Sequence, residues 1–228
     1  MTFSLLLIFG LAPSIVWLLF YLRKDTHPEP NAMILKVFFW GMVAAIPAIA
    51  IELGILFGLS KINFPQQILL FLYVFGGVAL VEEGLKYLVV RWKVLHNPAF
   101  DEPIDFILYM IIAALGFAAL ENMIILLGIT HAWTFSQVAA LTGLRFVGAT
   151  FLHALASGAF GYFVLLSFSD PSKKYLYFFS GLGISTLLHG LFNLSIIEVE
   201  GIAKFALPLL IVLGLAFFVS FGFRKFKK

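Results

Sequence analysis

Two adjacent glutamates and a lysine lie in an apolar stretch that is long enough to cross a membrane. Glu82, Glu83 and Lys86 stand near the end of a run that begins at about Ile68 and is otherwise almost wholly apolar. A carboxylate at membrane depth costs on the order of 3 kcal/mol even on the lenient insertion scale, so such acids indicate a functional site. Lys86 follows Glu82 by four residues and Glu83 by three, so on a helix it can pair with either. Adjacent helical residues point about 100° apart, so we expect one glutamate to face the reaction while the other holds the lysine.

Three further apolar stretches carry polar residues that could join this site. They are Glu121 with Asn122, then His153, and then His189 with Asn193, which lie four residues apart on one helical face. In one chemistry a glutamate takes a proton from water, a histidine orients it and an asparagine stabilises an oxyanion. In the other, Glu121, His153 and His189 hold a metal ion, with Zn²⁺ the candidate, while a second glutamate acts as base. Both chemistries are hydrolysis.

Other functions use the same residue types. Two intramembrane histidines can ligate haem, and acids with a lysine can relay protons in a carrier. A single histidine or asparagine of the set is explained equally well by hydrogen bonding between helices. Residue types and spacing therefore leave a hydrolase, a carrier or channel, and a cofactor-binding protein open.

Composition sets the structural class. Hydrophobic residues make up 62% of the chain and charged residues 12%, whereas a soluble domain is about 45–50% apolar. The formal charge of +3 comes from basic residues at the ends of apolar runs, where they indicate topology rather than a nucleic-acid partner. The chain has no cysteine, which excludes disulfides, thiolate catalysis and cysteine-bound metals.

The apolar runs predict an all-α polytopic membrane protein, a single integral membrane domain over 1–228 with a motif-bearing core at about 68–197. The expected spans are about 3–21, 33–59, 68–90, a helix that starts within 101–105 and reaches 128, 133–168, 175–197 and 205–223. The fifth stretch, of about 36 residues, is too long for one untilted crossing of about 30 Å. We therefore expect a break between Gly143 and Gly148, with Arg145 at an interface. If 133–147 crosses separately, the number of spans is eight rather than seven.

Basic residues also orient the spans. Most lie in loops of one side, and only Lys61 and Lys204 fall on the other. The positive-inside rule then places the N-terminus outside and the C-terminus, with Arg224, Lys225, Lys227 and Lys228, in the cytoplasm. Within the second span, Gly54 and Gly58 predict a close helix contact, and Glu52 is expected near the outer interface or in a structural pair.

Four motifs in order resemble the PrsW family of intramembrane proteases. The family's EExxK element matches Glu82, Glu83 and Lys86, and its FxxxEN element matches Phe117 to Asn122. Its histidine followed by small residues matches His153, and its HxxxN element matches His189 and Asn193. The related CAAX prenyl endopeptidases carry an EExxxR form instead, so the position of Lys86 favours the PrsW branch.

This resemblance implies an intramembrane endopeptidase that makes the site-1 cut in a membrane-anchored anti-sigma factor during bacterial envelope stress. The implied partners are a single-span protein and the lipid bilayer, and the implied location is the bacterial cytoplasmic membrane. The implied site contains Glu82, Glu83, Lys86, Glu121, Asn122, His153, His189 and Asn193. A shared site requires the carboxyl group of Glu82 or Glu83 to lie within about 12 Å of Glu121 or His189, although straight spans would put these residues at different depths.

Overall fold

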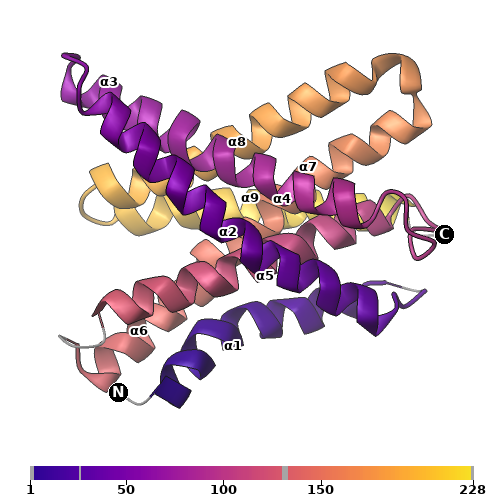
Figure 1. Cartoon of the computed structure of the whole chain (residues 1–228), viewed down its shortest axis with the longest axis horizontal. Coiled ribbons are helices and arrows are strands. Elements are labelled where there is room, and N and C mark those ends of the chain that lie inside the picture. The colour runs from indigo at the N-terminus through magenta and orange to yellow at the C-terminus, as the bar shows by residue number, and fades with distance from the viewer. Residues whose placement is uncertain (1–2, 26, 130–132, 227–228) are drawn as a thin grey trace.

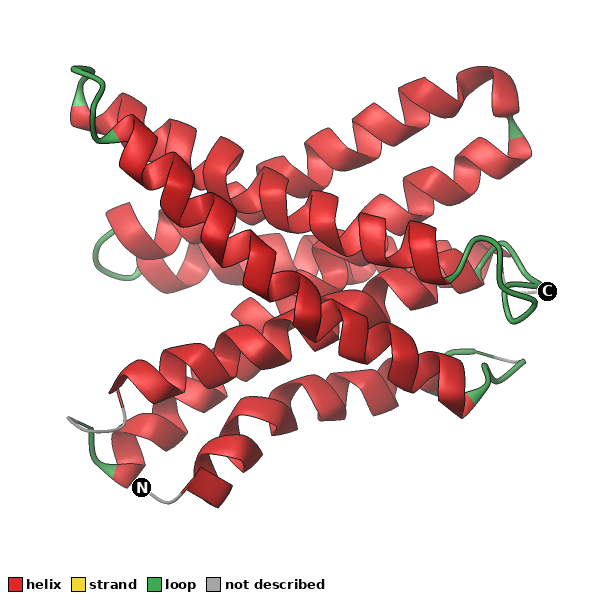
Figure 2. Cartoon of the chain, viewed as in Figure 1, coloured by secondary structure: helices red, strands yellow, loops and turns green. Residues whose placement is uncertain are grey.

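The computed structural model describes residues 3–25, 27–129 and 133–226, and every regular element in these ranges is helical (Figures 1 and 2). The elements are α1 (Phe3–Leu22), α2 (Asn31–Leu59), α3 (Gln66–Phe71), the π-helix η1 (Leu72–Ala79), α4 (Leu80–Lys93), α5 (Asp105–Ile129), α6 (Phe135–Val147), α7 (Ala149–Ser169), the short 3₁₀ helix η2 (Pro171–Lys173), α8 (Lys174–Glu198) and α9 (Ala203–Phe226).

Seven helical spans in the described part of the chain are long and apolar enough to cross a membrane, which confirms the predicted number. The fifth covers Phe135–Ser169 and consists of α6 and α7. It breaks at Gly148, whose φ of −105° and ψ of −96° lie outside the helical region. The predicted break between Gly143 and Gly148 is therefore confirmed.

The connections alternate between two ends of the bundle. The links from α1 to α2, from α4 to α5 and from α7 to α8 lie at the end where the chain finishes, and the N-terminus lies at the opposite end (Figure 1). The basic residues that were assigned to one side lie in these links, in the helix ends beside them and at the end of α9. Lys61 lies in the connection after α2 and Lys204 in the first turn of α9, both at the other end. Lys227 and Lys228 lie outside the described residues.

Helix α5 is the central helix. Its residues from Asp105 to Ala119 are all buried, and α2 crosses it at two glycines. A Cβ atom at Gly41 would lie 2.1 Å from the Ala113 carbonyl oxygen, and one at Gly116 would lie 2.0 Å from that of Phe38. Only glycine permits this approach, which is the packing that small residues allow between membrane helices.

The expected contact at Gly54 and Gly58 is wrong. A Cβ atom at either position would meet nothing within 4 Å. The GxxxG spacing places both glycines on one helix face, but the crossing point of α2 on α5 lies nearer the start of α2, where Gly41 faces Gly116.

The helix that carries Glu82 and Glu83 is not α-helical throughout. Residues Leu72–Ala79 form a π-helix, which leads directly into α4. A π segment is rare and changes the rotation of all residues that follow it relative to those before it. The faces of α4 that the glutamates occupy therefore depend on η1 as well as on their own spacing.

Besides the acids of the membrane spans, a buried group of acids lies at the start of α5. Glu29, in the link between α1 and α2, accepts a hydrogen bond from the Tyr109 hydroxyl. Asp105, the first residue of α5, accepts backbone N–H groups of Asp101 (3.2 Å) and Glu102 (2.8 Å). Burial, with a smaller effect of the nearby Asp105 carboxylate, raises the pKa of Glu29 to about 7. We call Glu29, Asp105 and Tyr109 the linker cluster, because it fastens the α1–α2 link to α5.

Candidate active site

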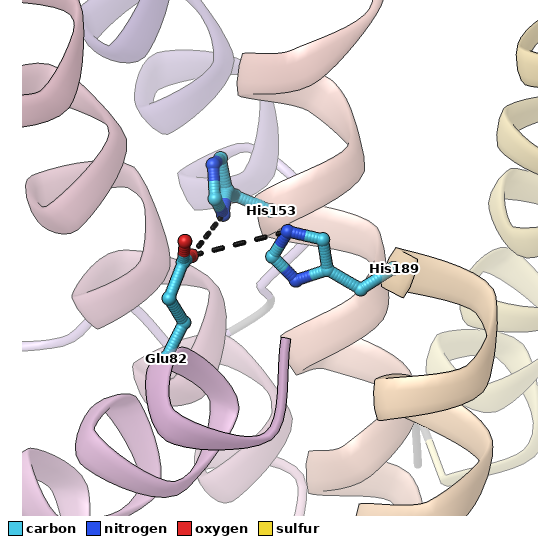
Figure 3. Close-up of side chains that lie close together, drawn as sticks. All are labelled: Glu82, His153 and His189. Atoms are coloured by element: carbon cyan, nitrogen blue, oxygen red, sulfur yellow. Dashed lines mark ion pairs between the residues drawn. The ribbon is translucent and has the colours of Figure 1, made fainter. Parts of the chain in front are cut away.

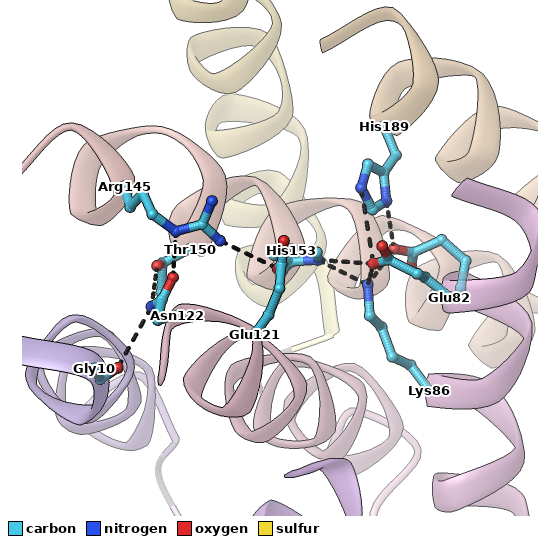
Figure 4. Close-up of polar contacts among 10 residues, drawn as sticks. Gly10, Glu82, Lys86, Glu121, Asn122, Arg145, Thr150, His153 and His189 are labelled. Carbon is cyan, nitrogen blue, oxygen red and sulfur yellow. Dashed lines mark hydrogen bonds and ion pairs between the residues drawn. The ribbon is translucent and has the colours of Figure 1, made fainter. Parts of the chain in front are cut away.

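Four helices bring the predicted polar residues together. The α4 residues Glu82, Glu83 and Lys86 meet His153 of α7 and His189 of α8, and Glu121 of α5 contacts His153 (Figure 4). Glu83 and Lys86 have no exposed surface, and the two histidines are almost completely buried. We call Glu82, Glu83, Lys86, Glu121, His153 and His189 the catalytic cluster.

Lys86 lies at the centre of this cluster. Its Nζ is 3.1 Å from Glu82 Oε2, 2.8 Å from Glu83 Oε1 and 2.8 Å from His153 Nδ1. The Phe117 ring covers it, with the ring centre 4.6 Å away. The sequence predicted that one glutamate holds the lysine, but both do. An ammonium group has three donors and no acceptor, so these three partners satisfy it completely.

The contact with Lys86 fixes the tautomer of His153. Because Nζ can only donate, Nδ1 of His153 accepts, and the ring proton of neutral His153 lies on Nε2. That nitrogen is 2.8 Å from Glu121 Oε2 and donates to it. His153 therefore joins the carboxylate of α5 to the lysine of α4.

Glu83 is the most completely paired carboxylate of the cluster. Its Oε1 accepts from Lys86 (2.8 Å) and lies 3.0 Å from His189 Nδ1, while its Oε2 accepts from the Ser157 hydroxyl at 2.6 Å. All its partners are donors, so it has no oxygen free for a substrate. Its arrangement suits a residue that positions His189 and Lys86.

Glu82 faces one ring nitrogen of each histidine. Its Oε2 is 3.5 Å from His153 Nδ1 and 3.9 Å from His189 Nε2, and both rings point toward the carboxylate (Figure 3). These three ligand atoms all lie within 4.8 Å of one another. Two imidazoles and one carboxylate form a common ligand set of catalytic zinc.

The surroundings of these three residues also fit a divalent ion. Each histidine keeps one nitrogen toward Glu82 and is held at the other by a carboxylate, Glu121 for His153 and Glu83 for His189. Carboxylates that orient ligating histidines are typical of metal sites. An ion would replace the contact between Lys86 Nζ and His153 Nδ1. The predicted ligand set was Glu121, His153 and His189, whereas the structure groups Glu82 with the two histidines.

Arg145 extends the network toward α6. Its Nη2 is 3.2 Å from Glu121 Oε2, and its Nε donates to Asn122 Oδ1 at 2.5 Å (Figure 4). Asn122 in turn donates to Thr150 Oγ1 at 3.0 Å and lies 3.5 Å from the Gly10 carbonyl oxygen. Asn122 thus fastens α1, α5 and α7 around the site without contacting the histidines. Arg145, expected at an interface, instead pairs with a site carboxylate.

Asn193 and Glu52 have no such partners. Asn193 is partly buried on α8, and its side chain makes no hydrogen bond with any residue that the structure describes. Glu52 Oε1 is buried and has no hydrogen-bond partner among the described residues. The structural pair expected for Glu52 is therefore not found in this part of the chain.

Ser157 and Arg145 were not recognised as site residues from the sequence. Ser157 follows His153 by four residues, so the helical repeat puts both on one face of α7. That spacing could have identified it. Arg145 carried no comparable signal, because its role depends on how α6 joins α7 at Gly148.

The shared-site prediction is confirmed by distance. Glu83 Oε1 lies 3.0 Å from His189 Nδ1, and His153 bridges Glu82 to Glu121. Glu82 lies about 16 Å along the helix from Lys93, and Glu121 about 24 Å from Asp105. The difference in depth is overcome because the spans are tilted against one another (Figure 1) and because His153 reaches between them.

Comparison with known proteins agrees with these motifs. A family model described as PrsW family intramembrane metalloprotease matches residues 29–221. The "Protease PrsW" of Bacillus subtilis (strain 168) is 29% identical over 221 residues, which are 96% of this chain and 93% of that protein. The "Protease PrsW" of Geobacillus kaustophilus (strain HTA426) is 30% identical over 193 residues, 84% of this chain and 79% of that protein. No solved structure matches significantly. The chain therefore belongs to the PrsW family of intramembrane proteases.

Proposed function

We propose that the catalytic cluster hydrolyses a peptide bond of a membrane-anchored substrate, with Glu82, His153 and His189 at the reacting centre. The observation that carries this proposal is the geometry of the two histidines. Each directs one ring nitrogen toward Glu82 while a second carboxylate holds the other nitrogen. Such an arrangement positions two imidazoles and a carboxylate around one point.

Glu82, His153 and His189 are the residues that would hold a divalent metal ion, for which zinc is the best match to the donor set. When bound, the ion supplies a Lewis acid that polarises the scissile carbonyl group and makes water a better nucleophile. Glu83, with Lys86 and Ser157, keeps His189 in place, and Glu121 does the same for His153.

Glu121 is the residue best placed to move the proton. Its side chain is 28% exposed, against 6% for Glu82 and none for Glu83. As general base it takes a proton from the attacking water while the water oxygen bonds to the carbonyl carbon. The same proton then passes to the amide nitrogen as the C–N bond breaks. Asn193 follows His189 by one helical turn and has no hydrogen-bond partner among the described residues, and in this proposal it donates to the oxyanion.

Glu121 and His189 lie nearer the outer ends of their helices, whereas Glu82 lies nearer the inner end of its span. Glu121 lies eight residues, about 12 Å, before the end of α5, and His189 lies nine residues, about 14 Å, before the end of α8. Both ends point away from the side with most basic residues. Under the positive-inside rule that basic side is cytoplasmic, so the N-terminus is outside and the C-terminus inside.

These positions agree with a first cut on the outer side of a bacterial cytoplasmic membrane. The substrate is then a single-span anti-sigma factor of an envelope-stress response, as the motif resemblance implies. The substrate class rests on that resemblance, and the side of the membrane rests on the resemblance together with the positions of Glu121 and His189.

The test is cleavage of a single-span anti-sigma reporter in membranes. Wild-type chain is compared with Glu82→Gln, Glu121→Gln and His189→Ala, each with and without a chelator and each checked for protein level. We expect all three variants and the chelator to stop cleavage, and zinc to restore the wild type. Cleavage that persists in Glu82→Gln contradicts the proposal. Cleavage that resists the chelator but still requires Glu82 would support a hydrolase that works without a metal ion.

A further inference from the structure

A groove lies on the far side of Arg145 from the catalytic cluster. It has a volume of about 440 Å³ and is formed by α6, the start of α7, the end of α8 and the start of α9. Its walls are almost entirely apolar and include Leu144, Phe192, Leu209 and Val212. We call this cavity the outer groove, because α9 begins and α8 ends at the side of the bundle opposite the basic links.

Among the described residues that line the outer groove, two are charged, and both are cations. They are Arg145 and Lys204. Lys204 makes no ion pair or hydrogen bond with a residue in the described ranges. Arg145 donates a hydrogen bond only through Nε, and its Nη2, though near Glu121, makes no hydrogen bond of good geometry. A guanidinium group has five N–H donors, so donors remain for a ligand that brings acceptor oxygens into an apolar cavity.

The two cations lie at different depths. Lys204 is the second residue of α9, at the outer end of the bundle. Arg145 contacts Glu121, which lies about 12 Å inside the end of α5. A lipid concentrates its acceptor oxygens in the headgroup region and continues as acyl chain. An extended peptide carries a carbonyl group about every 3.3 Å, so it can meet Lys204 and Arg145 at once.

The outer groove is also connected to the catalytic cluster. Arg145 pairs with Glu121 and with its neighbour Asn122. Phe192 lies three residues after His189, and its Cζ is close to where a Cβ atom on Gly148 would be, 3.4 Å away. One wall of the outer groove is therefore formed by residues of α6 and α8 that neighbour the catalytic cluster. A chain held in the groove reaches Arg145, which contacts Glu121, the most exposed acid of the cluster.

We propose that the outer groove binds an extended segment of the membrane-anchored substrate, adjacent to its span, with an acidic side chain on Lys204 and backbone carbonyls on Arg145. The inference rests on the proposed function, because it supplies the route by which a substrate reaches a buried site. It names the outer flank of the substrate as the part that is recognised, and a carboxylate in that flank as the specificity element.

Cysteine cross-linking tests this directly, since the chain contains no cysteine. Leu209→Cys places a thiol in the groove, and Leu210→Cys is the matched control, because Leu210 is the next residue on the same helix and does not line the groove. The two are similarly exposed, at 56% and 65%. Both are made in the full chain carrying Glu82→Gln, so that no cutting consumes the probe. The probe is a synthetic single-span reporter with a leucine–alanine span and an outer flank that contains one cysteine and one glutamate.

We expect the reporter to cross-link to Leu209→Cys several-fold more than to Leu210→Cys, with both thiols reacting with a maleimide. Replacing the reporter's glutamate by lysine should lower the yield by up to about fivefold, and Lys204→Glu should reverse this preference. Equal yields at the two cysteines, or a yield that ignores the charge exchange, overturn the inference. If phosphatidylglycerol in the liposomes displaces the reporter from Leu209→Cys, the occupant is an anionic lipid and the inference is also wrong.

These outcomes are separable from those for the proposed function, because cross-linking requires no catalysis. A wild type that cuts, combined with no preference for Leu209→Cys, rejects the groove and keeps the protease. A clear preference with no cutting by the wild type keeps the docking surface and rejects the hydrolytic proposal.

Discussion

The two buried acid clusters on α5 differ in what faces their carboxylates. In the catalytic cluster, Glu82 and Glu83 share Lys86, and Glu121 pairs with Arg145 and His153. In the linker cluster, Glu29 and Asp105 are close together, and their partners among the described residues are the Tyr109 hydroxyl and two backbone N–H groups. Cations keep buried carboxylates charged and available for chemistry, whereas acids without a cation favour a shared proton.

The catalytic cluster is suited to chemistry, whereas the linker cluster is suited to holding the fold together. The catalytic cluster has three acids and one fixed cation, Lys86, and Arg145 beside it supplies a second. With neutral histidines one negative charge is then unbalanced, which favours a divalent ion or a proton. The linker cluster joins a loop to the first turn of α5 and has no histidine within it. We expect substitutions in the catalytic cluster to affect cleavage most and those in the linker cluster to affect stability and its dependence on pH.

The largest expected effect is that of Glu82→Gln on cleavage. The amide keeps the shape of the side chain but removes the charge that faces His153 and His189. Cleavage of the reporter in proteoliposomes should fall by about 10²–10⁴-fold. Glu29→Gln is the matched acid-to-amide change in the linker cluster and should leave the rate within about twofold, since Glu29 touches no reacting group. Equal losses in the two variants would remove the distinction between the clusters.

Lys86→Met should cause the largest loss of stability. It removes the cation from Glu82 and Glu83 while keeping a side chain of similar length, and an uncompensated buried charge costs about 3–5 kcal/mol. The measurement is the free energy of unfolding in detergent. Adding Glu83→Gln to Lys86→Met should recover part of the loss, because one of the unpaired acids is then neutral. A double variant no more stable than Lys86→Met alone would contradict the assigned pairing.

Ser157→Ala should have a smaller effect of the same kind. The change removes the donor to Glu83 Oε2, and a lost hydrogen bond to a charged group costs about 1.5–3 kcal/mol. Ser185→Ala is the control, because that buried serine donates only to the Leu182 carbonyl of its own helix and should cost clearly less. Zinc binding measured by metal analysis should also weaken in Ser157→Ala, by about tenfold. Identical behaviour of the two serine variants would show that Ser157 does not support the site.

The smallest effect is a change in the pH dependence of stability. The pKa of Glu29 is about 7 in the folded protein, above its ordinary value, so the folded state binds the proton more tightly. This stabilisation is present at low pH and is lost as pH rises through 7, with a slope of at most about 1.4 kcal/mol per pH unit for one proton. In Glu29→Gln the melting temperature should vary less with pH between pH 5 and 8, a range chosen to bracket this pKa. The same slope in Glu29→Gln would assign the titration to another group, such as the neighbouring Asp105.

Hydropathy and isolated polar residues predicted most of the architecture and the site. Apolar runs determine the seven spans, because backbone groups in lipid must be satisfied within helices. Charged residues such as Glu82 and Glu121 are conspicuous in these apolar runs. Placing a charged side chain in a membrane costs free energy, so such residues indicate a functional site. The break at Gly148 followed from the length of the fifth run alone.

The differences from the structure concern how deep each residue lies and how each helix is rotated about its axis. The expected metal ligands were Glu121, His153 and His189, whereas the structure brings Glu82 together with the two histidines and leaves Glu121 bound to His153 Nε2. The Gly54 and Gly58 pattern was present, yet the crossing of α2 and α5 occurs at Gly41 and Gly116. Glu29 lies in a polar link that reads as solvated, and only the fold reveals that Tyr109 covers it.

The most direct test of the account is cleavage by the purified chain alone. Wild type, Glu82→Gln and Glu29→Gln are reconstituted in liposomes with one single-span reporter, and mass spectrometry locates any cut. The account predicts a single cut on the outer flank of the reporter by wild type and by Glu29→Gln, and none by Glu82→Gln. A cut that also appears with Glu82→Gln would contradict the assignment of the catalytic cluster.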